Sequence, residues 1–202
     1  VHGADKGTMT LFGAPYAPGS AQEAIEQGVV TVHQSIDDGV IPDLDVASNL
    51  LLNRLTEPGS GFFVRKKAMR IEAARVAAAM GLDLDPGATV GDLGLAERQL
   101  IAIARAMARN PKVLVLDEPT SSLSATEADR LFRLIDRLRE QGVAILYISH
   151  RTSDIRRIAD RIVSMRDGGI AGVFEGPELD HEGAVTAMLG HAMTAVDVTV
   201  AE

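Results

Sequence analysis

The chain has no cysteine, no long apolar run and no excess of positive charge, and each absence excludes a class of protein. Without cysteine it cannot carry a disulfide, which fits a cytosolic protein. No apolar run approaches the roughly 20 residues that a membrane-spanning helix needs, and no signal peptide opens the sequence. With 28 acidic against 20 basic residues the net charge is -8, so nucleic acid and anionic membrane surfaces are unfavourable direct partners.

Apolar residues are plentiful, and one apolar run ends in two acids. Hydrophobic residues make up 46% of the 202 residues, which is enough for one sizeable core or two small ones. The run Val113–Leu116 predicts a buried parallel strand, and Asp117 and Glu118 follow it directly. Ligands of open α/β sheets bind at this edge, where an Asp can hold Mg²⁺ and the next residue can face an attacking water. A solvated turn before a helix would also explain the two acids.

Two further apolar runs end in polar side chains. Residues 144–148 are followed after one serine by His150, and residues 28–32 are followed after one histidine by Gln34. A Gln in this place can reach a metal ion or a water, and a His can hydrogen-bond a ligand. Taken alone, each could instead satisfy backbone groups nearby. Their occurrence together with the acid pair, in one order and at compact spacing, favours a site.

Helical patterns separate these strands. Residues 35–92 change to helices punctuated by Pro and Gly, which we interpret as an inserted helical subdomain. Its clearest helix stops at Gly81 and carries Met, Ala and Val at helical spacing, a stripe typical of core. A second helix, over about residues 96–109, has Leu, Ile, Ala and Met on one side and precedes the acid-tipped strand. A capping box from Ser124 to Glu127 opens the helix that leads to the next strand.

The alternation of helices and strands predicts an α/β fold with a mainly parallel sheet. Residues 161–165 and 170–174, separated by Asp-Gly-Gly, predict a β-hairpin at the edge of this sheet. The basic triplet at residues 65–67 is interpreted as a solvated face.

The order of these motifs resembles one family over nearly the whole chain: the nucleotide-binding subunits of ABC transporters, and among them the ATPases of bacterial monosaccharide importers. The resemblance is carried by the Q-loop-like Val32–Gln34, the signature-like Leu93–Gln99, the Walker B-like Leu116–Thr120, the D-loop-like Ser121–Ser124 and the switch-histidine-like Tyr147–His150. Residues 81–86 and 120–127 resemble the first of two ATPase halves that such importers fuse in one polypeptide. Residues 188–190 resemble the place where that half closes, so a second half is expected beyond Glu202.

The resemblance implies a P-loop ATPase core with an inserted α-helical subdomain, of which the N-terminal part of the core is missing. On this view, the chain divides into a remnant of the N-terminal β part of the core (1–34), a helical subdomain ending in the signature motif (35–95), the core with Walker B, D-loop and switch His (96–190) and a tail or linker to a second half (191–202).

The resemblance also implies a role for each site residue. Glu118, His150 and Gln34 are expected to be catalytic: Glu118 as general base, Gln34 as a contact to Mg²⁺ or the attacking water, and His150 as a hydrogen-bond partner of the γ-phosphate. Asp117 and Gln34 are the expected Mg²⁺ ligands. ATP is the expected nucleotide, and the signature helix would act in trans on the ATP of the opposite domain in a head-to-tail dimer. The expected nucleotide-binding residues are Asp117, Gly94, Ala96, Glu97 and Ser124.

The sequence departs from the family pattern in two places. No Gly-x-x-x-x-Gly-Lys-Ser/Thr occurs in the 202 residues, although this loop cradles the β- and γ-phosphates in the family. We expect it upstream of Val1, so that the chain alone is inactive; the alternative is that the loop was never there. In the signature, Gly94 replaces the usual Ser and Ala96 the usual second Gly, which removes a hydroxyl donor. We hypothesise that the ATP site completed by this segment is weak.

The sequence thus predicts the ATP-binding and hydrolysing subunit, or a fragment of it, of an ABC importer for a sugar or similar small solute. Expected partners are a second ATPase half, transmembrane permease subunits and, indirectly, a solute-binding protein; the expected location is cytoplasmic, peripheral on the inner face of the cell membrane. The alternative is a non-catalytic ABC domain that serves as structural or regulatory partner of an active half. The altered signature favours it, and intact Asp117, Glu118 and His150 oppose it. A soluble ABC ATPase of translation or DNA repair is disfavoured by the acidic charge and the absence of long heptad repeats.

Overall fold

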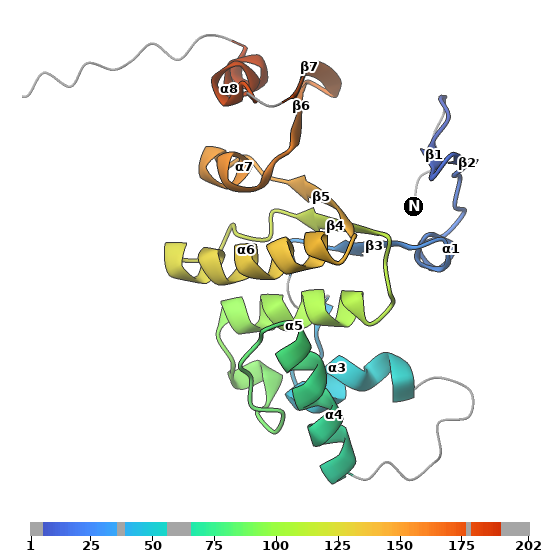
Figure 1. Ribbon diagram of the computed structural model, residues 1–202, viewed down its shortest axis with the longest axis vertical. Helices are drawn as coiled ribbons and strands as arrows, with labels where there is room; N and C mark the ends of the chain where they lie inside the picture. Colours follow the sequence, from blue (N-terminus) through green and yellow to red (C-terminus); the bar gives the residue numbers. More distant parts are fainter. Residues whose placement is uncertain (1–5, 36–38, 56–65, 177–178, 191–202) are drawn as a thin grey trace, which may run out of the picture. The chain divides into compact units, whose positions relative to one another are not determined.

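The computed structural model describes residues 6–35, 39–55, 66–176 and 179–190, without the side chains of residues 53–55 (Figure 1). The chain forms two compact units, residues 1–148 and 149–202. The elements of the first unit are β1 (Thr10–Leu11), β2 (Ala14–Pro15), α1 (Ala21–Glu26), β3 (Val29–Val32), α3 (Val46–Leu55), α4 (Lys66–Ala79), the 3-10 helix η1 (Val90–Asp92), α5 (Leu95–Met107), β4 (Val113–Asp117), α6 (Ala125–Glu140) and β5 (Ala144–Ile148).

The centre of the first unit is a parallel sheet with strand order β3-β4-β5. The predicted parallel sheet is therefore confirmed, with each of the three apolar runs forming one strand. Leu114 and Leu116 of β4 are completely buried, as expected for a central strand covered by helices. In β5, by contrast, Leu146 and Ile148 are 54% and 45% exposed, so only one face of this strand is covered in the described structure.

Helix α5 connects the sheet with α3 and α4, because it contacts β3, α6 and α3, and α3 in turn contacts α4 (Figure 1). The apolar side predicted for α5 is confirmed, since Leu100, Ile101 and Ala104 are buried. Ala108, predicted on the same side, lies beyond the last residue of α5 and is exposed. Burial also extends past the predicted side, because Ile103 is fully buried. The reason is that neighbours pack around α5 on several sides, which the short side chains of its many alanines permit.

Helix α4 ends as predicted. Gly81 has a φ of 67°, in the left-handed region that favours glycine after a helix. In the predicted stripe, Ala73 and Met80 are buried whereas Met69 and Val76 are half-buried, so the stripe contributes to the core at its more buried positions, and Ala77 joins them. Among the described residues, no helix has the length and apolarity to cross a membrane.

The second unit contains α7 (Thr152–Ile158), β6 (Arg161–Arg166), β7 (Gly169–Glu175) and α8 (His181–Leu189). Strands β6 and β7 form the predicted hairpin. They make a two-stranded sheet of their own, so the prediction that the hairpin forms the edge strands of the parallel sheet is wrong. Helix α8 packs on both strands, and the buried Ser164 hydroxyl donates to the Ala184 carbonyl at 2.7 Å.

Candidate functional site

The carboxyl ends of the three parallel strands coincide. Val32 of β3 pairs with Leu116 of β4, and Asp117 pairs with Ile148 of β5. Side chains that directly follow the strands therefore share one edge of the sheet, which is where open α/β sheets bind ligands. The edge carries Gln34, Asp117 and Glu118.

Glu118 has a left-handed backbone conformation. Its φ is 46°, a left-handed conformation that costs a non-glycine residue about 1–2 kcal/mol. A hydrogen bond to β5 stabilises this conformation: the Glu118 amide donates to the Ile148 carbonyl at 2.9 Å. The chain therefore turns sharply at the end of β4, directly after Asp117.

Gln34 and Glu118 are brought together although they are 84 residues apart. The Gln34 side-chain amide donates from Nε2 to Glu118 Oε2 at 3.4 Å, and the contact is exposed to solvent. An amide and a carboxylate thus face one another at the sheet edge. Both could contact a water or ion placed between the strand ends.

Asp117 offers oxygen atoms that the described chain does not use. The residue is half-buried at the end of β4, and within the described ranges its carboxylate has no hydrogen bond or ion pair. No cluster of three or more His, Cys, Asp or Glu residues exists in the same ranges. An Asp with a nearby amide oxygen fits Mg²⁺, because this ion keeps several waters and takes further oxygens from substrate phosphates.

Two residues without an expected role hold the turn after Glu118. Thr120 is buried, and its hydroxyl lies 3.3 Å from that of Tyr147 on β5. The Tyr147 ring also packs against Phe132 of α6, with ring centroids 6.4 Å apart. Both residues stand in motifs recognisable from the sequence, but only the parallel pairing of β4 with β5 shows that they meet.

The signature segment forms the beginning of α5. Gly94 is the N-cap, and its amide donates to Glu97 Oε2 at 3.0 Å. Ala96, in the first turn of α5, is buried. Free amides at a helix N-terminus favour an anion.

Ser124 caps α6 as the capping box predicts. Its hydroxyl accepts from the Glu127 amide at 3.4 Å and lies 2.6 Å from Glu127 Oε2, to which it donates. Hydrogen bonds from the Ser124 side chain and backbone lower the pKa of Glu127. The hydroxyl of Ser124 is therefore engaged within its own helix.

His150 belongs to the second unit. It is exposed, and the neighbouring Ser149 Oγ accepts from the Arg151 amide at 3.0 Å at the start of α7.

Comparison with known proteins identifies the family. The family model for ABC transporters matches residues 2–121, which is more than half of the chain. The chain belongs to the ABC transporter family.

Relatives of this ABC protein are sugar importer subunits by name. One relative is a ribose/galactose/methyl galactoside import ATP-binding protein of Burkholderia cenocepacia. This chain is 41% identical to it over 189 residues, and the alignment covers 94% of this chain and 36% of the relative. This chain is 40% identical over 187 residues to the arabinose import ATP-binding protein AraG of Pseudomonas savastanoi pv. phaseolicola, covering 92% and 36%. The chain thus spans about a third of the length of the curated relatives that it matches.

Solved structures support the ABC fold independently. A nucleotide-free ATP-binding cassette from an ABC transporter superposes with a TM-score of 0.73 at 21% identity, covering all of this chain and 79% of that one. The ADP conformation of MJ1267, an ATP-binding cassette of an ABC transporter, superposes with a TM-score of 0.73 at 22% identity. The superposition covers 93% of this chain and 75% of that one. The predicted α/β P-loop ATPase fold is therefore confirmed.

Proposed function

We propose that this chain supplies the hydrolytic sheet edge and signature helix of an ATPase subunit that energises the import of a sugar or similar small solute. The observation that carries the proposal is the contact between Gln34 and Glu118, at 3.4 Å, beside the unused carboxylate of Asp117. The reaction is phosphoryl transfer to water, in which positioned groups and charge stabilisation supply most of the catalysis.

Asp117 and Gln34 are the proposed holders of Mg²⁺. Bound there, the ion would neutralise charge on the phosphate oxygens. Asp117 has free carboxylate oxygens at the strand end, and Gln34 has a side-chain carbonyl that its contact with Glu118 leaves available. The remaining ligands would be waters and nucleotide phosphates, because the described residues offer no further carboxylate cluster.

Glu118 is the proposed general base. Its backbone is fixed to β5 and its Oε2 is oriented by Gln34, so the carboxylate is positioned before a water arrives. His150 is the proposed hydrogen-bond donor to the γ-phosphate. Its place in the chain, two residues after the last residue of β5, supports this role.

Gly94, Ala96 and Glu97 are proposed to act on the nucleotide of a second ATPase domain, through the amides at the start of α5. Ser124 would contact that partner indirectly, since its hydroxyl is used in the cap of α6. A solved ATP-binding cassette of 20% identity, MJ0796, is dimeric, and a head-to-tail pair is proposed here by analogy.

The sugar specificity of the proposal comes from the names of the relatives. The expected permease subunits and solute-binding protein are proposed as partners on the same ground, and with them a location on the inner face of the membrane. The phosphate loop is proposed to be supplied outside the 202 residues, since no Gly-x-x-x-x-Gly-Lys-Ser/Thr lies among them.

The substitution Glu118→Gln in the intact native protein tests this proposal. It keeps the shape of the side chain and the contact to Gln34 but removes the base, so we expect ATP binding within twofold of wild type and a fall in hydrolysis of about 10²-fold or more. Binding would be followed with a fluorescent ATP analogue and hydrolysis by phosphate release. Glu140→Gln, on the far end of α6, is the matched control and should leave both unchanged. Turnover retained by Glu118→Gln would contradict the role of Glu118.

A non-catalytic ABC domain remains the second candidate, favoured by Gly94, which provides no hydroxyl in the signature. The same experiment separates the two functions. Two results together would show that the chain is a regulatory partner instead of a catalyst. The wild-type protein would not bind the ATP analogue, and an associated ATPase domain would hydrolyse ATP only when this protein is present.

A further inference from the structure

A second concave site lies in the first unit, formed by α6, the first turns of α5 and the loop after α4. The cavity has a volume of about 310 Å³, at the lower end of the range for small-molecule sites. None of the residues at the carboxyl edge of the sheet lines it. Its apolar surface comes from Met80, Leu82, Leu100 and Leu134.

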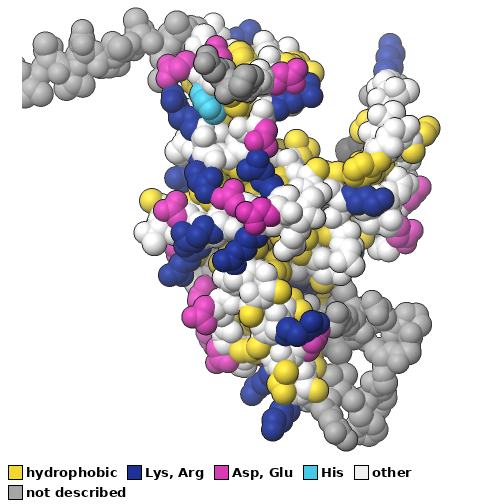
Figure 2. Space-filling view, viewed as in Figure 1, with side chains coloured by type: hydrophobic (Ala, Val, Ile, Leu, Met, Phe, Trp, Pro, Cys, Tyr) yellow, Lys and Arg dark blue, Asp and Glu magenta, His cyan; other side chains and the backbone are white. Residues whose placement is uncertain are grey.

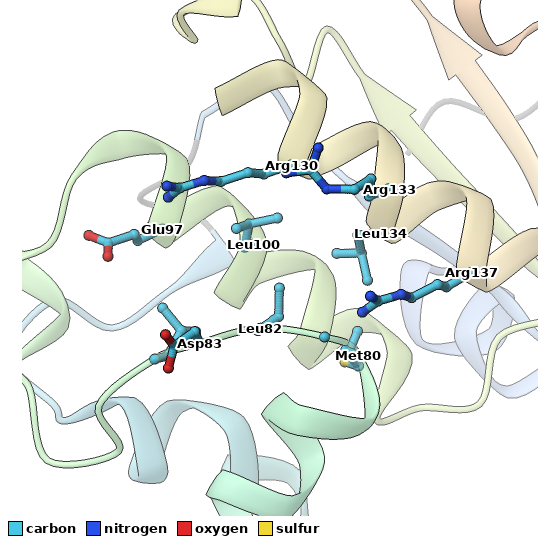
Figure 3. Close-up of a pocket in the computed structure, with 11 residues that line it drawn as sticks. Met80, Leu82, Asp83, Glu97, Leu100, Arg130, Arg133, Leu134 and Arg137 are labelled. Atoms are coloured by element: carbon cyan, nitrogen blue, oxygen red, sulfur yellow. The ribbon is translucent and has the colours of Figure 1, made fainter. Parts of the chain in front are cut away.

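Three arginines follow one another along the α6 side of the cavity (Figure 3). Arg130, Arg133 and Arg137 are spaced by three and four residues, which places them on one face of the helix. Figure 2 shows basic side chains gathered where Figure 1 places α6. A chain with a net charge of -8 thus concentrates positive charge at one hollow.

Two of these arginines lack an anionic partner. Within the described part of the chain, Arg133 and Arg137 have no ion pair and no side-chain hydrogen bond. The guanidinium of Arg137 lies against Gly81, in the space that a Cβ would occupy. Arg139 of the same helix, in contrast, pairs with Asp136 at 3.6 Å. Carboxylates are therefore within reach on α6, but Arg133 and Arg137 do not pair with them.

The opposite side of the cavity limits what can bind. Asp83 and Glu97 line it from the loop after α4 and from α5 (Figure 3). The Glu97 carboxylate is already an acceptor for the Gly94 amide at 3.0 Å. A long polyanion would meet both acids, whereas a compact dianion can contact the arginines alone.

We propose that this cavity binds a small phosphate monoester. The guanidinium groups match phosphate oxygens in charge and in the geometry of their N–H donors. The carbon part of the ester would lie on Leu82, Leu100 and Leu134, which gives an ester an advantage over the free ion. The bound ester would lie beside Glu97, in the first turn of α5. Occupancy of the cavity would therefore be linked to the position of α5.

Titration calorimetry with glycerol 3-phosphate tests the proposal on the intact native protein, with saturating ADP and Mg²⁺ present so that the nucleotide site is already filled. We expect saturable one-to-one binding, absent with glycerol and weaker with inorganic phosphate. Arg133→Gln should weaken it about tenfold, since a charge-assisted hydrogen bond is lost. Arg139→Gln, on the same helix but outside the cavity, should bind as wild type does.

Three outcomes would overturn the proposal. One is no saturable heat with wild-type protein, and another is unchanged affinity in Arg133→Gln. The third is inorganic phosphate binding as tightly as the ester, because the apolar surface would then contribute nothing. A melting temperature of Arg133→Gln equal to that of Arg139→Gln shows that weaker binding is not misfolding. Because turnover is not measured, the result does not depend on the proposed ATPase function.

Discussion

At the scale of the residue, Glu118 shows how position and chemistry are linked. The left-handed φ of 46° is unfavourable for a glutamate. The hydrogen bond from its amide to Ile148 and the one from Gln34 to its carboxylate offset part of that cost. Strain held in place by neighbours is frequent at functional sites, which supports the role proposed for Glu118.

Gly94 gives a prediction at the same scale. A Cβ at this position would meet only Glu97 Oε2, at 3.6 Å, and the backbone has φ -64° and ψ 161°, so a serine fits without strain. As an N-cap, serine should raise stability by a few tenths of a kcal/mol. If its hydroxyl also reaches the γ-phosphate across the dimer, turnover at that site should rise about tenfold in Gly94→Ser, as one charge-assisted hydrogen bond would give. Thermal unfolding and phosphate release of the intact protein measure the two effects. A more stable variant with unchanged turnover would refute the weak-site hypothesis.

At the scale of the element, the capping box of α6 predicts a dependence of stability on pH. The Ser124 hydrogen bonds lower the pKa of Glu127 from its ordinary value of 4.5, since they favour the ionised carboxylate. The stabilisation is therefore complete above pH 4.5 and is lost as the pH falls through the lower pKa of the folded state.

Ser124→Ala checks this prediction. At neutral pH it should cost about 1 kcal/mol, as loss of an N-cap serine does. The difference from wild type in melting temperature should then shrink as the pH is lowered below the ordinary carboxyl range. Ser122→Ala, exposed in the same loop, should match wild type throughout. A difference that stays constant down to low pH would show that Glu127 takes no part.

A second prediction concerns how α5 is joined to the segment after Gln34. Arg105 Nη1 donates to the Gly39 carbonyl at 2.6 Å and to Asn49 Oδ1 at 3.5 Å, and Asn49 is fully buried. Burial, and after it the charge of Arg109, lowers the pKa of Arg105. Arg105→Gln should therefore destabilise the protein by about 1–3 kcal/mol, since buried acceptors lose their donor. Urea unfolding measures this, with Lys67→Gln, at an exposed position of α4, as control. Equal midpoints for the two variants would show that the contacts do not hold α5 in place.

At the scale of the whole molecule, the chain matches about a third of the length of its relatives. We predict that the native polypeptide contains a Gly-x-x-x-x-Gly-Lys-Ser/Thr loop preceding Val1. The residues proposed for hydrolysis can act only on a nucleotide whose phosphates are bound, and this loop binds the β- and γ-phosphates. Intact mass and N-terminal sequencing of the protein from its own cells would show it. A native start near Val1 without the loop would contradict this and favour the regulatory candidate.

The sequence by itself determined the local structure. The runs that form β3, β4 and β5, the capping box at Ser124 and the glycine stop at Gly81 could all be predicted. These features depend on periodicity, capping and φ preference, which act over a few residues. The motifs also identified Gln34, Asp117 and Glu118 as candidates from their place after apolar runs.

Only the tertiary structure decided which of these residues meet. The contact of Gln34 with Glu118 and that of Thr120 with Tyr147 depend on the order and register of parallel strands, which long-range pairing sets. The burial of α5 on several sides, the independent hairpin of β6 and β7 and the arginine-lined cavity were likewise invisible in the sequence. Each depends on packing between segments far apart in the chain, and local preference carries no information about such partners.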